Sequence, residues 1–301
     1  MQLALATFWL LDGILQLQAF FFTKSFGLQM ISGMSSGNPS VVARPITWSA
    51  TAIGHHAVLT DAIFAVVQIT IAFAIAWRPT LKTGLVASIV WSAGVWWIGE
   101  ALGGILNGTA DPVNGAPGAV ILYALLAVLL WPTDRAAPGA PFVAARSVGG
   151  PIARGLWVVL WGSLAYLAVL GINRSPRYLR DLISGETSGE PRWLAILDRH
   201  AASMVDHHGL LVSTVLAILL LIVAAGAYFP AVLANATLVL AAVIGLVVWV
   251  VGENFGALFT NGATDLNSGP LLILLAAAYW RWPPNPGALH AALDRHLGIE
   301  A

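Results

Sequence analysis

The chain has 301 residues, of which 58% are hydrophobic and only 9% are charged, and its mean hydropathy is +0.81. Soluble proteins carry about 25% charged residues, so this composition excludes an ordinary soluble domain and predicts a polytopic membrane protein. The 14 basic and 14 acidic residues balance, which gives no electrostatic reason to expect nucleic acid as a partner. The absence of cysteine excludes disulfides, thiolate metal sites and iron–sulfur clusters.

Apolar segments follow one another along the chain, most of them long enough to cross about 30 Å of hydrocarbon. We expect eight, at residues 3–22, 57–77, 83–105, 117–132, 154–172, 208–229, 231–257 and 269–282. The N-terminus lacks the basic region and cleavage site of a signal peptide, so we expect the first segment to remain as a helix. The sequence therefore predicts an all-α bundle of about eight transmembrane helices, multi-pass in the inner or plasma membrane.

The polar residues recur in the same order in the two halves of the chain. The matching pairs are Trp9 with Trp161 and His55-His56 with His207-His208 at an offset of 152, Gly99-Glu100 with Gly252-Glu253 at 153, and Asn107 with Asn261 and Asp111 with Asp265 at 154. Such self-similarity is typical of a repeat architecture, and an even number of helices per copy gives both copies the same orientation. We predict two tandem four-helix units, residues 1–150 and 151–284, followed by a cytoplasmic tail at 285–301.

Long extramembrane connections are expected at 23–54 and 173–206. Within the second, residues 191–205 place Trp193, Leu197 and Met204 at helical spacing, which predicts a short helix lying on the membrane surface. Basic residues are equally frequent on both sides of the membrane. On the side of the termini, however, they lie in short connections close to helix ends, where the positive-inside rule is strongest, so we expect cytoplasmic termini.

Carboxylates close two of the apolar runs, at Glu100 and at Glu253. A carboxylate inside the membrane costs roughly 2.5–3.5 kcal/mol at mid-bilayer, so we interpret Glu100 and Glu253 as ligand- or ion-binding. We assign the same role to four residues in the turns that follow, which are Asn107, Asp111, Asn261 and Asp265. The alternative is that the GxxxG glycines bring two helix backbones together while each glutamate bonds a neighbouring loop.

The first half carries additional intramembrane polarity. Asp12 and Gln16 share a face of the first helix, and Asp61 and Gln68 share a face of the second, whereas their counterparts in the second half are Leu164, Ala168, Ser213 and Leu220. Asp12 and Asp61 either pair structurally or line an ion or proton path beneath Glu100. We place any asymmetric function in the first half.

Histidine pairs open the second helix of each half. His55, His56, His207 and His208 are candidate ligands of a metal ion that Glu100 or Asp111 would complete. The alternative is that these imidazoles are hydrated at the headgroup level. Haem and quinone are less favoured cofactors than a metal ion.

A four-helix unit combines Leu11-Asp12-Gly13 in its first helix, a long external connection and a small-residue-rich second helix that ends in the basic turn Trp77-Arg78-Pro79-Thr80. This arrangement resembles the DoxX-like four-helix membrane proteins. The resemblance covers each half once, and it implies an association with quinone-linked redox subunits without assigning a catalytic residue.

The leading interpretation is an integral membrane protein whose extracytoplasmic His/carboxylate site binds a small ligand, either a metal ion or another cation, with transport as its activity. One alternative is a redox subunit that docks quinone or haem, and another is a structural or assembly protein. The chain has no nucleophile elbow, P-loop or dinucleotide fingerprint, so an enzyme is not expected. Its expected partners are the lipid bilayer and either another membrane protein or a second copy of the chain.

Overall fold

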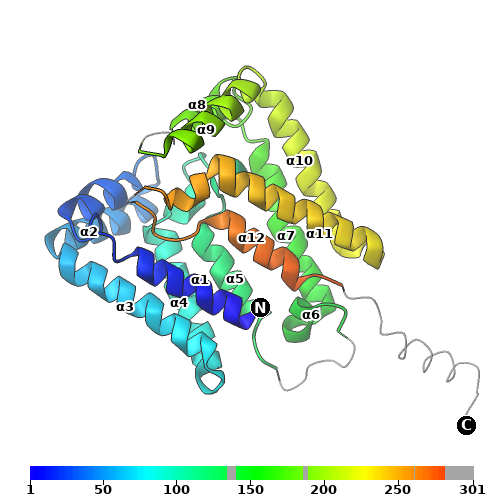
Figure 1. Ribbon diagram of the computed structural model, residues 1–301, viewed down its shortest axis with the longest axis horizontal. Coiled ribbons are helices and arrows are strands. Elements are labelled where there is room, and N and C mark those ends of the chain that lie inside the picture. Colours follow the sequence, from blue (N-terminus) through cyan, green and yellow to red (C-terminus); the bar gives the residue numbers. More distant parts are fainter. Residues whose placement is uncertain (134–139, 186–188, 261, 282–301) are drawn as a thin grey trace, which may run out of the picture.

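The computed structural model describes residues 1–133, 140–185, 189–260 and 262–281. Within these ranges every regular element is helical and no strand is present, so the all-α prediction is confirmed there (Figure 1). The predicted tail at 285–301 lies outside the described residues.

The described residues 1–133 contain five α-helices, with longer connections before α2 and α5. They are α1 (Gln2–Leu15), α2 (Ser40–His55), α3 (Ala57–Ala76), α4 (Leu81–Ile98) and α5 (Ala119–Leu129). The second half contains α6 (Val143–Val148), α7 (Gly150–Ala168), α8 (Tyr178–Gly185), α9 (Arg192–Val205), α10 (Gly209–Ala225), α11 (Ala231–Val247) and α12 (Ser268–Ala278).

Five helical stretches are long and apolar enough to cross a membrane, by length and composition. They are α3, α7, α4 with the turn before it (Arg78–Ile98), α10 with the turn after it (Gly209–Tyr228), and α11 with the turn after it (Ala231–Gly252). Three further apolar helices, α1, α5 and α12, are shorter. Each of the eight apolar segments expected from the sequence thus contains a helix, but the length criterion is met by five.

The first segment is shorter than the predicted 3–22. Its helix ends at Leu15 and the chain continues in tight turns, because Phe21 turns away to become fully buried against Phe26 and Ile46. A π-helical turn at Phe26–Ile31 then leads toward α2. The apolar cluster so formed lies apart from the main core.

The helices of the two halves pack in the same order. In the first half α1 lies against α3, α3 against α4 and α4 against α5; in the second, α7 lies against α10, α10 against α11 and α11 against α12. The short helices α5 and α12 meet in the centre (Figure 1). The main hydrophobic core crosses this meeting point and includes Trp9, Tyr123 and Trp157. The indole of Trp9 donates to Ser88 Oγ at 3.0 Å and that of Trp157 to the Val223 carbonyl at 2.8 Å, so both tryptophans are buried with their polar atom satisfied.

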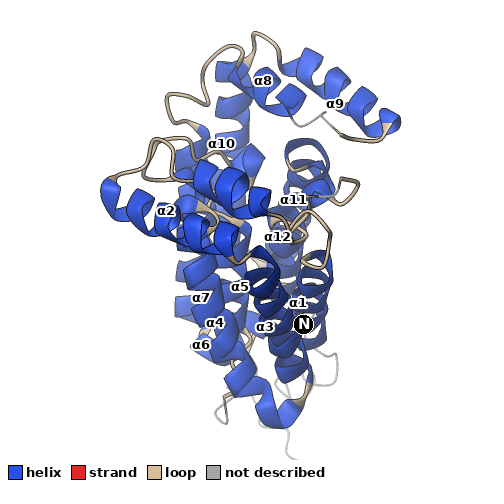
Figure 2. Cartoon of the chain, turned by 90° about the vertical axis from the view of Figure 1, so that its left-hand side faces the viewer, coloured by secondary structure: helices blue, strands red, loops and turns tan. Residues whose placement is uncertain are grey.

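The surface helices differ in part from expectation. The helix predicted over 191–205 is present as α9, and α8 and α9 lie at the end of the bundle opposite α6 (Figure 2). Residues 23–54 are predicted as a connection, yet they contain the 16-residue helix α2. The missed signal is an apolar face at helical spacing, made by the buried residues Val42, Ile46, Ala50 and Ile53.

Two left-handed turns follow the long helices that precede α5 and α12. Four consecutive residues have positive φ in each: 48°, 58°, 65° and 70° over Ala101–Gly104, and 47°, 56°, 68° and 56° over Asn254–Ala257. Left-handed conformation costs an L-residue about 1–2 kcal/mol, so both turns must be held by their surroundings. The backbone approach is close: a Cβ added at Gly103 would lie 2.1 Å from the Pro117 carbonyl oxygen.

Gly252 lies where the backbones of the two halves approach each other closely, and a substitution there tests this contact. A Cβ added at Gly252 would lie 1.8 Å from the carbonyl oxygen of Val113, which belongs to the other half. We expect Gly252→Ala to destabilise the protein by about 1–3 kcal/mol because backbone must move to admit the methyl group. The measurement is the thermal unfolding midpoint of the purified protein in detergent.

The matched control is Gly155→Ala in α7, where a Cβ would meet no heavy atom within 4 Å. This variant should unfold at or slightly above the wild-type temperature, because alanine is the better helix former. Equal midpoints for the two variants would contradict the proposed contact.

Candidate functional site: the carboxylate cavity

One cavity of about 770 Å³ gathers most of the polar residues singled out in the sequence. It lies among α1, α3, α4, the turn before α2 and the loops that precede α5 and α12. Five acidic side chains line it, and we call it the carboxylate cavity after them: Asp12, Glu100, Asp111, Glu253 and Asp265. Asn107 also lines it, whereas Asn261 lies outside the described residues. Among the described residues that line the cavity, none is lysine, arginine or histidine.

The walls of the cavity are apolar and aromatic. Trp9, Phe26, Phe64 and Trp91 contribute rings, and Phe64 and Trp91 meet edge to face with centroids 5.4 Å apart. Most of the lining comes from the first half of the chain, as expected from its additional polarity. The second-half counterparts Leu164 and Leu220 belong instead to the apolar core.

Glu253 caps the buried N-terminus of α12. Its Oε1 accepts hydrogen bonds from the Ser268 backbone N–H at 3.1 Å and from the Ser268 hydroxyl, and its Oε2 accepts from the Gly269 N–H at 2.9 Å. The first N–H groups of a helix have no partner within the helix, and the helix dipole favours a negative charge there. This geometry supports the structural interpretation of Glu253.

Glu100 does the same for α5, but with fewer bonds. Its Oε1 accepts from the Val120 N–H at 3.2 Å, and its Oε2 has no hydrogen-bond partner among the described residues. A Cβ added at Gly118 would lie 2.1 Å from this second oxygen, so only glycine admits the carboxylate here. Glu100 therefore combines a capping role with a free oxygen beside the cavity.

The turn aspartates shape the loops above the cavity. Asp111 Oδ1 accepts from the Val113 N–H at 2.8 Å, and Asp265 Oδ1 accepts from the Asn267 N–H at 2.6 Å, so each closes a turn on the backbone two residues further on. Thr264 donates its hydroxyl to Asp265 Oδ2 at 2.9 Å, whereas Asp111 Oδ2 has no partner among the described residues. Burial raises the pKa of Asp111 to about 6, against the hydrogen bond from Val113.

Each of these loops is held by a side chain from the other half. Gln18 Nε2 donates to the Ala263 carbonyl at 2.9 Å, and Asn173 Nδ2 donates to the Ala110 carbonyl at 3.1 Å. Ala110 lies one residue before Asp111, and Ala263 lies two residues before Asp265. Both halves are therefore needed to hold the loops that line the cavity.

Asp12 and Asp61 lie in different surroundings. Asp12 is 2% exposed, lines the cavity, and its Oδ1 has no hydrogen-bond partner among the described residues. Asp61 is fully buried but does not line the cavity, because Gln16 lies between and donates its Nε2 to Asp61 Oδ1. The sequence left open whether these two aspartates pair or share an ion path, and the structure gives them different roles: Asp12 lines the cavity, and Asp61 accepts a hydrogen bond from Gln16.

The four histidines do not reach the cavity. His55 and His56 are exposed at the junction of α2 and α3, and His207 and His208 are exposed at the junction of α9 and α10. Among the described residues no three His, Asp or Glu side chains are grouped so that they could hold a metal ion. The metal role of His55, His56, His207 and His208 stays a prediction from the sequence that this geometry does not support.

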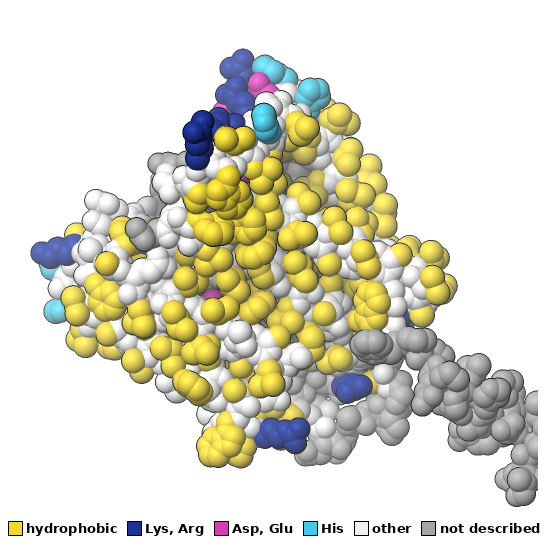
Figure 3. All heavy atoms as spheres, viewed as in Figure 1, with side chains coloured by type: hydrophobic (Ala, Val, Ile, Leu, Met, Phe, Trp, Pro, Cys, Tyr) yellow, Lys and Arg dark blue, Asp and Glu magenta, His cyan; other side chains and the backbone are white. Residues whose placement is uncertain are grey.

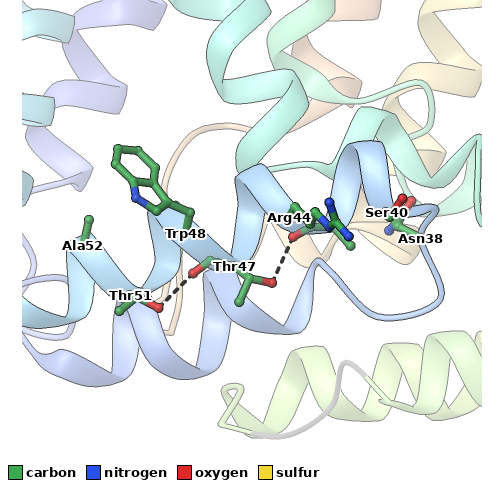
Figure 4. A pocket seen from close by; sticks show the side chains of 8 residues that line it. Asn38, Ser40, Arg44, Thr47, Trp48, Thr51 and Ala52 are labelled. Carbon is green, nitrogen blue, oxygen red and sulfur yellow. Dashed lines mark hydrogen bonds between the residues drawn. The ribbon is translucent and has the colours of Figure 1, made fainter.

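A second hollow lies along the exposed side of α2 (Figure 4) and is lined by Asn38, Ser40, Ala43, Arg44, Thr47, Trp48, Thr51 and Ala52. All of its lining comes from one helix and the turn before it. The hydroxyls of Thr47 and Thr51 each donate to a carbonyl of the same helix at 2.9 Å, so they are already satisfied. The carboxylate cavity, with unpaired buried acceptors from several elements, is the better candidate site.

The capping role of Glu253 predicts a graded effect of substitution. Glu253→Ala leaves the Gly269 N–H and the Ser268 hydroxyl without this acceptor, whereas the Ser268 N–H keeps Asn267 Oδ1 at 2.9 Å, so we expect a loss of about 2–4 kcal/mol in unfolding free energy. Glu253→Gln keeps one acceptor oxygen and should lie between that variant and the wild type. Thermal unfolding in detergent measures both, and Glu100→Ala, which removes one such bond, should cost less. Wild-type stability of Glu253→Ala would exclude the capping role.

The buried carboxyl of Asp111 predicts a pH dependence of stability. Its pKa is about 6 in the fold against 3.8 for an unperturbed aspartate, so the folded state holds an extra proton between these values. Stability from this group is therefore complete below about pH 4 and is lost as the pH rises to about 6. Asp111→Asn should remove this dependence, about 2–3 kcal/mol, while still accepting from Val113. Parallel curves of unfolding midpoint against pH for variant and wild type would refute the assignment.

Comparison with known proteins gives no further information on the site. No family model, no curated protein and no solved structure matches the chain. The resemblance of each half to DoxX-like proteins accordingly stays an expectation from the sequence.

Proposed function

We propose that the chain is an integral membrane protein of the inner or plasma membrane that binds a cationic small ligand in the carboxylate cavity. The observation that supports this most is the composition of the lining: five carboxylates and, among its described residues, no basic side chain. A buried negative charge needs a positive partner or a proton, because it has lost its hydration. A cationic ligand supplies that partner.

Among the described lining residues, four of the five unpaired buried side-chain atoms are oxygens that can accept, and the fifth is the indole N–H of Trp91. Asp12 Oδ1, Gln68 Oε1 and Asp111 Oδ2 are buried acceptors without a hydrogen-bond partner among the described residues. Buried polar groups are nearly always hydrogen-bonded, so a ligand that occupies the cavity gains most if it brings several N–H or O–H donors. An ammonium group brings both the donors and the charge.

An organic cation suits this cavity better than a bare metal ion. The described residues provide no cluster of three ligating side chains, whereas the walls provide the rings of Trp9, Phe64 and Trp91. Aromatic faces attract organic ammonium groups by cation–π interaction. A volume of about 770 Å³ also matches the small-molecule range rather than a single ion.

The membrane setting is supported by the surface. The face in Figure 3 is mostly hydrophobic, with basic and histidine side chains gathered toward its upper and left edges and a few basic ones along the lower edge. Side chains such as Phe73 and Val232, at 63% and 82% exposure, point outward from membrane-length helices. The apolar stripe of α9, with Trp193 and Met204 at 54% and 79% exposure, suits a helix lying on the bilayer.

We further propose eight transmembrane helices in two tandem units, with cytoplasmic termini. The support for the repeat is local as well as global: equal packing order, two left-handed turns, and a glutamate that caps the last helix of each half. The three short apolar helices would span only together with the loops that adjoin them, buried in protein at membrane depth.

Binding is better supported than a continuous path across the membrane. The cavity ends at Trp9, and below it Leu5, Tyr123 and Leu126 are packed in the main core with no exposure. Transport would require this packing to open. We therefore state the function as ligand binding.

The test is isothermal titration of the purified protein with ethylammonium chloride, against sodium chloride at the same ionic strength. We expect saturable ethylammonium binding that Asp12→Asn weakens roughly 10- to 100-fold, since a charged hydrogen bond is worth about 1.5–3 kcal/mol. The control is Asp181→Asn, whose side chain is 61% exposed and lies outside the cavity. No ethylammonium binding, or an equal effect of both substitutions, would overturn the proposal.

A further inference from the structure

The carboxylate cavity reaches the outer surface of α4. Val90 and Gly94 line the cavity, and both are exposed, Val90 by 66%. They lie four residues apart and so share one face of the helix. A Cβ added at Gly94 would meet no heavy atom within 4 Å, so the space beside this residue is open.

This opening lies on a surface that is suited to lipid. α4 is one of the helices long and apolar enough to cross a membrane, and Val86, one turn before Val90, is also exposed, by 47%. Gly94 lies four residues before the end of α4, about 6 Å along the axis, which is the depth of the upper acyl region of the adjacent leaflet. Trp91, between the two residues, is half-buried and leads into the cavity.

Resting on the cation-binding function above, we propose that the ligand is an amphipathic amine, an apolar body with an ammonium head, which enters sideways from the bilayer past Gly94. The aromatic side chains Phe26, Phe64 and Trp91 receive the apolar body, and the carboxylates that line the cavity, Asp12 among them, receive the head. An amphipathic amine inserts into a bilayer with its apolar body among the acyl chains and its ammonium group at the headgroups.

A free amine fits better than the headgroup of an aminophospholipid. An aminophospholipid also carries a phosphate close to its ammonium group, and no basic side chain among the described lining residues could pair with it. Bringing that phosphate beside five carboxylates would be repulsive. The ligand therefore carries positive charge without a neighbouring negative one.

The experiment measures binding of tritiated dodecylamine to the protein in phosphatidylcholine nanodiscs, with empty nanodiscs as blank. Dodecanol shares the body without the charge, and ethylamine shares the head without the body. We expect dodecylamine to bind at least tenfold more tightly than ethylamine, and neither dodecanol nor added phosphatidylethanolamine to compete. Competition by dodecanol would overturn the inference by showing that the charge is irrelevant, and competition by phosphatidylethanolamine would identify a lipid headgroup instead.

Gly94→Trp tests the route, and Gly94→Leu repeats the test with a smaller side chain. Both should slow dodecylamine association at least tenfold, because the added side chain fills the opening beside Gly94. The matched control is Gly162→Trp in α7, which also has no heavy atom within 4 Å of an added Cβ and lies outside the cavity.

The outcomes separate the two proposals. If ethylamine binds as well as dodecylamine and the Gly94 variants change neither, lateral access is wrong while the cation site stands. If no amine binds, both proposals fail. If the Gly162 variant slows association as much as the Gly94 variants, the opening on α4 is not the route.

Discussion

Two helix N-termini buried in the centre of the protein determine how the rest of the chain is arranged. α5 and α12 have 11 residues each, about 16 Å of helix, which is half the thickness of the proposed bilayer. Their first N–H groups therefore begin inside the protein, where water cannot satisfy them. Glu100 and Glu253 supply the missing acceptors, and the loops that carry them must dip into the bundle to do so. The cavity is the space that these dipping loops leave beneath the surface.

The two halves pack their helices in the same order but differ in the polarity of their interiors. In the second half the positions that correspond to Asp12, Gln16 and Gln68 are Leu164, Ala168 and Leu220, which fill the space with apolar packing. In the first half polar side chains line a hollow instead. The first half thus supplies most of the cavity lining, while the second half supplies Glu253 and Asp265. The reciprocal hydrogen bonds from Gln18 and Asn173 join the two halves at the loops beside the cavity.

The sequence could predict what depends on local pattern. Hydropathy located an apolar helix in each expected segment, helical spacing located α9, and the cost of burying charge identified Asp12, Glu100, Asp111, Glu253 and Asp265, all of which line one cavity. It could not predict what depends on contacts between distant segments. Nothing near Glu253 in sequence indicates that its partners are Ser268 and Gly269, and adjacent histidines at a helix junction have the same pattern whether they face a ligand or water. The amphipathic face of α2 was visible but missed.

The left-handed turns have an unequal energetic weight in the two halves. In the first turn two of the four residues, Gly103 and Gly104, are glycines that adopt positive φ without strain; in the second only Gly256 is. The second turn therefore holds three side-chain-bearing residues at positive φ against two in the first, and the additional one, Asn254, is of a type that tolerates this conformation. It is also the turn whose glutamate accepts three hydrogen bonds rather than one. Of the two loops that line the cavity, the first-half loop is therefore held by fewer hydrogen bonds from its glutamate, and it is the one that can change conformation at the lower energetic cost when a ligand arrives.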